Sequence, residues 1–223
     1  MKTSSFLIIE IIGMAFIMAA CSPRGNIQKI LPQSSNPAHQ SFNGNPDSAV
    51  FVTSDISNFW AAYDKFYQDT TQNPFGADYI DIGSNGVRGF LKYRIQDKDY
   101  LRSVVIEKKS SYDNVRSNTL RLSEKEKQCR SIFYAMKYWY PEAVFPPVYC
   151  VIGAFNSGGT VSNDGLIIGT EIQQDIDNIP YDIAHELIHF QQNKTYNPTL
   201  LTQAIHEGSA DFLGELISGY SNN

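Results

Sequence analysis

Two histidines one helical turn apart constrain this chain more than any other feature of its sequence. They are His185 and His189, and Glu186 directly follows the first, so the segment has the pattern HExxH. Pro180, a residue favoured in the first turn of a helix, precedes the pattern. Apolar residues recur at helical spacing through the segment: Ile183, Leu187 and Phe190. We therefore expect a helix that buries one side and points both imidazoles in one direction.

This arrangement of side chains is typical of a zinc site. Two imidazole nitrogens one turn apart can reach a zinc ion at ~2.1 Å without distorting the helix. Glu186 is adjacent to the first ligand and is placed to act on water that the metal activates. The pattern also arises by chance on structural helices, with both histidines at the surface. Because His185 and His189 are two of only four histidines in the chain, we favour a site for one Zn²⁺.

A catalytic zinc ion needs a third protein ligand and an open position for water. One class of zinc peptidase has a glycine three residues and a histidine six residues beyond the second histidine. This chain has Gln192 and Thr195 there, which excludes that class. Glu207 is the remaining candidate, with seventeen residues between it and His189. We expect residues 197–219 to form a helix antiparallel to the first, which would return Glu207 to the histidines.

Three further residues near Glu207 are candidates for supporting roles. Asp211 lies one helical turn later and is placed to accept a hydrogen bond from the free NH of a ligand histidine. His206 differs from Glu207 by ~100° around a helix, so only one of them points at the metal, and the Glu-x-x-x-Asp pairing favours Glu207. His206 then faces solvent or lines the cleft as a proton or oxyanion partner. Tyr220 is a second candidate for stabilising the oxyanion.

The first twenty residues form an expected secretion signal. Lys2 precedes an almost wholly apolar run over residues 6–18, and two alanines end the segment. Cys21 follows in a sequence that resembles a lipobox, so we expect cleavage before Cys21 and lipid attachment to its thiol. A different cleavage point or a retained membrane helix are the alternatives, and Glu10 within the apolar run disfavours the second. The chain would then be lipid-anchored in the bacterial cell envelope, facing the periplasm, since no acidic run follows Cys21.

The remaining sequence indicates a tether and one domain. Residues 21–49 are rich in Ser, Asn, Pro, Gln and Gly, as in a flexible linker, and residues 50–223 suffice for one substantial core. The net charge of -5 and the absence of any Lys/Arg run exclude nucleic acid as an expected partner. Beyond Cys21 the only cysteines are Cys129 and Cys150, which fit either a disulfide or two buried thiols.

The expected fold is α+β, with a small, mostly antiparallel sheet packed on the helices that carry HExxH and Glu207. We expect helices from Ser54 or Asp55 to about residue 69 and from Ser123 to Pro141. Residues 148–152 read as a buried strand, and residues 160–170 as a hairpin. The segment 78–115 permits no assignment. Residues 166–172, which precede the HExxH helix, are expected at the cleft edge, where they would pair with an extended substrate.

Residues 185–192 and 207–212 together resemble the gluzincin-like predicted zinc-dependent proteases classed as a domain of unknown function. They are also similar to related lipoproteins found beside bacterial gliding-motility components. The match covers about residues 181–219. The resemblance implies a zincin-like fold, with His185, His189 and Glu207 as zinc ligands and Glu186 as the base.

These features predict a membrane-anchored zinc metallopeptidase of the HExxH type that hydrolyses a peptide or protein substrate. Glu186 would take a proton from zinc-activated water and pass it to the leaving amine. The alternative is a catalytically inactive zincin-fold lipoprotein that serves a gliding or secretion machine through envelope protein partners. The chain ends at Asn223, soon after the third ligand, which favours the alternative. The intact Glu186 favours the peptidase, and a metal-storage role fits a single site with few cysteines poorly.

Overall fold

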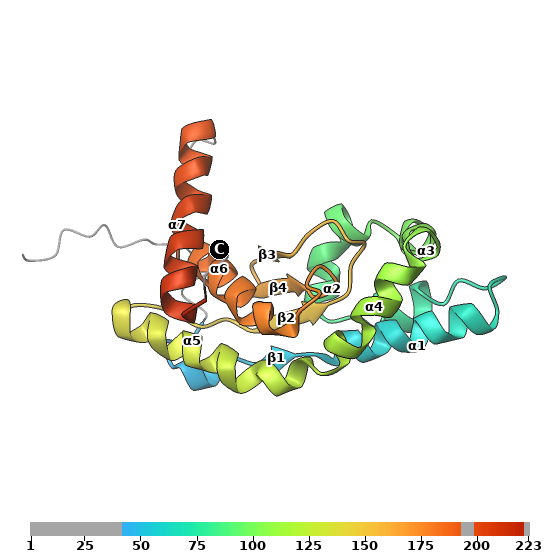
Figure 1. The fold of residues 1–223 in the computed structure, drawn as a ribbon, viewed down its shortest axis with the longest axis horizontal. Helices are drawn as coiled ribbons and strands as arrows, with labels where there is room; N and C mark the ends of the chain where they lie inside the picture. The colour runs from blue at the N-terminus through green and yellow to red at the C-terminus, as the bar shows by residue number, and fades with distance from the viewer. Residues whose placement is uncertain (1–41, 193–198, 221–223) are drawn as a thin grey trace, which may run out of the picture. The chain divides into compact units, whose positions relative to one another are not determined.

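The computed structural model describes residues 42–192 and 199–220 as an α+β fold, with helices packed around a small sheet (Figure 1). The sheet contains β1 (Phe51–Val52), β2 (Val148–Val151), β3 (Gly159–Val161) and β4 (Leu166–Gly169), in the order β1-β2-β4-β3. No helix in this part of the chain is long and apolar enough to cross a membrane. The expected signal segment, Cys21 and most of the expected tether lie outside the described residues.

The sheet is mixed, and the expectation of a mostly antiparallel sheet was wrong. β1 pairs with β2 in parallel, and β2 pairs with β4 in parallel, so only the β3–β4 pair is antiparallel. The expected hairpin is confirmed: β3 and β4 pair in antiparallel orientation, and residues 162–165 form the turn between them. Gly165 adopts a φ of 147° in this turn, a value that favours glycine. The parallel pairs arise from long crossovers, of which the helical segment between β1 and β2 is the longest.

Seven α-helices lie in the described part of the chain: α1 (Ser54–Gln68), α2 (Asn85–Phe90), α3 (Lys98–Glu107), α4 (Lys109–Leu120), α5 (Glu126–Trp139), α6 (Ile179–Gln191) and α7 (Leu200–Ser218). Those expected around residues 54–69 and at HExxH are confirmed. A 3-10 turn over Leu122–Lys125 precedes α5, so that helix begins three residues later than expected. Thr199 caps α7, and the expected start at 197–198 lies outside the described residues.

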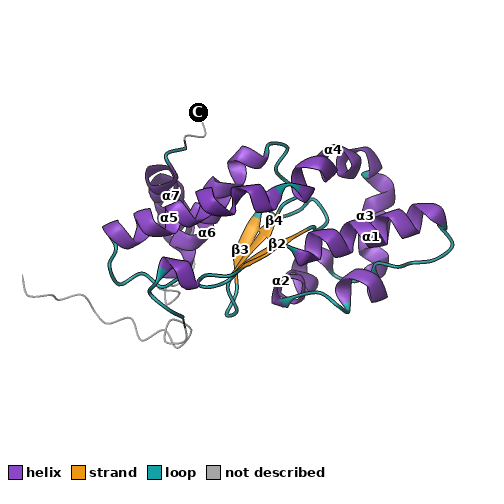
Figure 2. Cartoon of the chain, turned by 90° about the horizontal axis from the view of Figure 1, so that it is seen from below, coloured by secondary structure: helices purple, strands orange, loops and turns teal. Residues whose placement is uncertain are grey.

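Helices cover both faces of the sheet, as Figure 2 shows. On one face α2 packs so closely on β2 that a side chain at Gly86 would collide with Tyr149. The segment that carried no sequence assignment is therefore mostly helical, and α2 is the part of it that packs on the sheet. On the other face, Cys150 of β2 and Cys129 of α5 line a small cavity together with Ile179 and Ile183 of α6. Every residue of β2 and β4 is buried, as expected for strands covered on both sides.

The two cysteines of the domain are buried free thiols and do not form a disulfide. Burial raises the pKa of the Cys129 thiol to about 12, and burial raises the pKa of Cys150 as well. Both side chains therefore behave as small apolar residues of the core. Of the two arrangements that the sequence allowed, the structure has the second.

The folded body also includes residues that the sequence analysis assigned to the tether. The ring of Phe42 packs edge-on against Phe190 of α6, with 5.5 Å between ring centroids. Ala49 is buried just before β1, and Arg130 of α5 donates a hydrogen bond to its carbonyl oxygen. This short segment therefore braces the outer side of the helix that carries HExxH.

Candidate metal centre and active site

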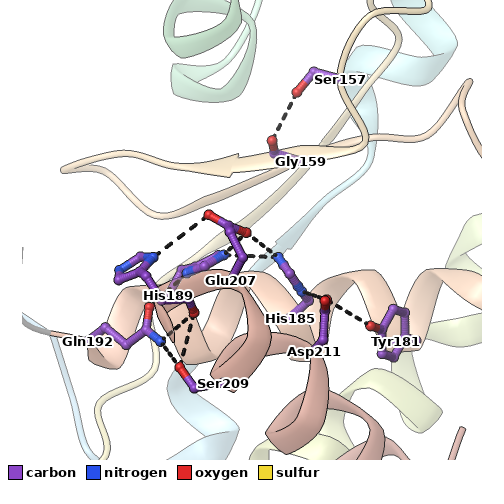
Figure 3. Close-up of polar contacts among 10 residues, drawn as sticks. Ser157, Gly159, Tyr181, His185, His189, Gln192, Glu207, Ser209 and Asp211 are labelled. Atoms are coloured by element: carbon purple, nitrogen blue, oxygen red, sulfur yellow. Dashed lines mark hydrogen bonds and ion pairs between the residues drawn. The ribbon is translucent and has the colours of Figure 1, made fainter. Parts of the chain in front are cut away.

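Helices α6 and α7 bring three candidate metal ligands together (Figure 3). The Nε2 atoms of His185 and His189 are 2.9 Å apart. Oε2 of Glu207 lies 3.1 Å from Nε2 of His189 and 3.5 Å from Nε2 of His185. The three side chains that the sequence nominated as ligands therefore converge on one point between the two helices.

The spacing of these atoms fits a zinc ion. Two ligand atoms that are each ~2.1 Å from a tetrahedral metal are about 3.4 Å apart. The three observed separations of 2.9, 3.1 and 3.5 Å are near this value. Two imidazoles and one carboxylate are also the donor set of a catalytic zinc with an open fourth position. Since the Glu207 side chain is 60% exposed, the site is open to solvent on that side.

A second layer of hydrogen bonds orients both imidazoles. Nδ1 of His185 lies 2.9 Å from Oδ1 of Asp211, the partner that the helical spacing predicted. Tyr181 donates a hydrogen bond to the same oxygen at 3.2 Å. Nδ1 of His189 lies 2.8 Å from Oε1 of Gln192, whose amide group in turn donates to α7. In both histidines Nδ1 is engaged, which leaves Nε2 facing the centre.

The sequence analysis missed Tyr181 and Gln192 as supporting residues. Gln192 was considered only as a departure from another zinc motif. Its position three residues after His189 was a usable signal, because residues at that spacing lie on one side of a helix. Tyr181 lies four residues before His185, so the same rule would have found it.

Replacing Asp211 by asparagine is expected to weaken zinc binding about 10- to 100-fold, because His185 would lose a charged partner that holds its ring and increases its basicity. Titration of the purified chain with zinc against a competing chelator measures this. Glu107→Gln is the matched control, since Glu107 is an exposed acid of α3. Equal zinc affinity in all three proteins would contradict a supporting role for Asp211.

Glu186 is held in a buried position beside the candidate metal ligands. Its side chain is only 8% exposed, and burial raises its pKa to about 8, with further contributions from Glu207 and Asp182. The absence of a side chain at Gly159 permits this placement, because a Cβ there would lie 2.5 Å from Oε1 of Glu186. A carboxyl group with a raised pKa at the floor of a cleft is suited to proton transfer near neutral pH.

The remaining two candidates differ in position. The His206 ring stacks on the His189 ring, with centroids 4.5 Å apart and 14° between the planes, and its Nδ1 lies 3.8 Å from Oε1 of Glu207. It therefore lines the cleft beside the ligand cluster. Burial, followed by the neighbouring His189, lowers the pKa of His206. Tyr220 lies instead against Tyr181, with ring centroids 5.7 Å apart, and does not line the cleft.

The cleft has two pockets that meet at His185 and Glu186. The first, which we call the Arg94 pocket, has a volume of about 290 Å³ and also contains His189, His206 and Glu207. The second, the Asp182 pocket, has a volume of about 270 Å³ and also contains Tyr181 and Asp211. β3 borders the Arg94 pocket along its length, and Gly159 lines both pockets.

The strand at the cleft edge is β3, which corrects the expectation for residues 166–172. β4 lies within the sheet, because it pairs with β2 on one side and β3 on the other. The outer side of β3 is the edge of the sheet in the described part of the chain. An extended peptide could add to this edge, whereas β4 offers none.

The cleft contains two charged residues that the sequence analysis did not consider, Asp182 of α6 and Arg94. Arg94 belongs to a short π-helical turn, η4 (Leu91–Ile95), within the segment that carried no assignment. It lines the Arg94 pocket and lowers the pKa of Glu186 against the effect of burial. No periodicity or motif connects Arg94 to HExxH, so only the folded chain reveals their proximity.

Comparisons of the chain with protein-family models, curated proteins and solved structures found no match.

Proposed function

We propose that this chain is a zinc-dependent metallopeptidase that hydrolyses peptide bonds. The observation that carries the proposal is the convergence of His185, His189 and Glu207 beside a buried carboxyl group, Glu186, at the floor of a cleft. A structural zinc site is usually closed by four protein ligands and has no need of a nearby base. The open side of this cluster and the position of Glu186 therefore favour catalysis.

In this proposal each residue has a distinct task. His185, His189 and Glu207 hold the zinc ion, which when bound would activate water and polarise the substrate carbonyl. Glu186 accepts a proton from the attacking water and donates it to the leaving amine. Asp211 and Gln192 keep the ligand imidazoles in the required tautomer and orientation.

The proposed substrate is an extended stretch of peptide or protein. The edge of β3 lies along the Arg94 pocket and offers backbone groups for pairing with a substrate strand. Such pairing would fix the peptide over Glu186 without demanding a particular sequence. With the expected lipid anchor at Cys21, the substrates would be proteins or peptides of the bacterial cell envelope.

Zinc analysis combined with a hydrolysis assay tests the proposal. The purified full chain is expected to hold about one zinc ion and to hydrolyse a mixture of unstructured peptides. Chelation should abolish hydrolysis, and added zinc should restore it. A protein that binds no zinc would refute the proposal, and stoichiometric zinc without hydrolysis of any peptide would favour the second candidate function.

The second candidate is an inactive zincin-like component that binds a protein partner in the cell envelope. One observation favours it, because α7 exposes a row of large apolar side chains: Leu201, Ile205, Phe212 and Leu216. Exposed apolar surface along one side of a helix is typical of a contact with another protein. The peptidase remains the first proposal, since a partner surface on α7 would leave the buried Glu186 without a role.

A further inference from the structure

Arg94 differs from every other arginine in the described part of the chain. Each of the others donates at least one hydrogen bond from its guanidinium to the protein: Arg88, Arg102, Arg116, Arg121 and Arg130. For Arg94 no such bond is present among the described residues. Its guanidinium carbon instead lies 5.8 Å from the centroid of the Phe90 ring, and its donors are available to the cleft.

Several backbone features fix the main chain at Arg94. Its turn, η4, is π-helical, a form that is frequent at functional sites. Gln96, two residues later, adopts a φ of 60°, which is unfavourable for a residue other than glycine. The side-chain amide of Asn156 donates a hydrogen bond of 3.0 Å to the Arg94 carbonyl oxygen. The fold thus fixes the backbone of Arg94 while its guanidinium stays unpaired.

The charges of the two pockets are different. Besides Glu186, which both pockets share, the Arg94 pocket contains a permanent cation and the candidate metal ligand Glu207, whereas the Asp182 pocket contains Asp182 and Asp211 and no lysine or arginine. A bound metal ion would offset the charge of Glu207, so an anionic group of a bound molecule would be attracted to Arg94 in the first pocket and repelled from the second. Glu186 lies between them, and Arg94 acts on its carboxyl group only through charge, since no hydrogen bond or ion pair joins the two side chains in the described part of the chain.

We propose that Arg94 binds a carboxylate of the substrate and so fixes the direction in which a peptide crosses Glu186. The guanidinium has a planar fork of donors that matches a carboxylate with two parallel hydrogen bonds. The carboxylate belongs either to an Asp or Glu side chain or to the C-terminus of the peptide. This inference rests on the proposed peptidase function, because it concerns the substrate of the same cleft.

Peptide binding tests the inference separately from catalysis. The probes are labelled hexapeptides made in four forms, with Glu or Gln at one position and with a free or amidated C-terminus. Binding is measured by fluorescence anisotropy to the zinc-loaded full chain that carries Glu186→Gln, alone and combined with Arg94→Gln, Arg94→Lys or Arg94→Glu. Arg121→Gln is the matched control, since Arg121 is a surface arginine paired with Glu124.

Peptides with a carboxylate are expected to bind about 10- to 100-fold more tightly than the neutral forms. Arg94→Gln should abolish this preference, Arg94→Lys should retain part of it, and Arg121→Gln should leave it unchanged. Arg94→Glu should select peptides with lysine instead. The Glu-to-Gln and amidated forms show whether the side chain or the C-terminus supplies the carboxylate.

Three results would overturn the role of Arg94: no preference for carboxylate peptides, a preference that persists in Arg94→Gln, or no peptide binding. The same peptides are also tested for hydrolysis by proteins in which Glu186 is intact. If Arg94→Gln lowers kcat equally for acidic and neutral peptides, Arg94 serves Glu186 and not the substrate. Carboxylate-dependent binding without any hydrolysis would retain this inference and refute the peptidase function.

Discussion

Replacing Glu207 by alanine is expected to lower the zinc content of the purified chain from about one ion to nearly none. Only His185 and His189 would remain as protein ligands, and two imidazoles on one helix leave half of a tetrahedral shell to water. Glu207 comes from α7, so a bound zinc ion would also join that helix to α6 through this residue. Elemental analysis after gel filtration measures the zinc that stays bound.

His206→Ala is the matched control for this experiment. His206 is the neighbour of Glu207 on α7 and stacks on His189, but it is not one of the three converging residues, and its Nδ1 lies 3.8 Å from the second oxygen of Glu207. We therefore expect His206→Ala to retain the zinc ion. Loss of zinc in His206→Ala with retention in Glu207→Ala would show that histidine is the third ligand.

Local periodicity explains what the sequence predicted well. The helices α1 and α6 have apolar residues at helical spacing, so their extent and buried faces could be predicted without knowledge of any partner. The same rule places His185 and His189 on one side of α6 and aligns Asp211 with Glu207 on α7. These relationships are set within single helices, and they include most of the candidate site.

Long-range pairing explains what the sequence could not predict. β1 has only two residues, and its parallel partner β2 lies beyond five helices, so no local pattern reveals their register. The hairpin was visible, but which of its strands lies at the edge depends on the pairing of β4 with β2. The sequence analysis therefore assigned the cleft edge to the wrong strand of a correctly recognised hairpin.

Arg94 was missed for a related reason. Its segment contains short helical and π-helical turns with glycines that are needed for close packing on the sheet, and this composition is also that of a loop. A lone arginine in such a segment has no partner in the sequence that would mark it as functional. Its proposed role rests only on its position in the same pocket as His185, Glu186 and His189 of α6.

Replacing Glu186 by glutamine is expected to lower kcat for peptide hydrolysis about 100- to 10,000-fold while zinc stays bound. Glutamine has nearly the same shape as glutamate, but its amide group cannot accept and return a proton. Zinc content and kcat are measured on the same preparation, beside Glu107→Gln as the matched control. Undiminished hydrolysis by the Glu186→Gln protein would exclude Glu186 as the base and leave the mechanism without a proton carrier.

Although Glu186→Gln is expected to lower kcat, we expect it to raise the thermal stability of the metal-free chain at alkaline pH. Folding raises the pKa of Glu186 from 4.5 to about 8, chiefly through burial, so the folded state disfavours the ionised carboxylate. This group therefore does not change the free energy of unfolding below pH 4.5, and it lowers that free energy progressively as the pH rises from 4.5 towards 8. Glu186→Gln removes this loss, and we expect its Tm to exceed that of the wild type at pH 8 but to equal it at pH 4. Burial of a residue that costs stability at neutral pH, beside candidate metal ligands, supports the proposed catalytic role of Glu186, because active sites are where such a cost is expected.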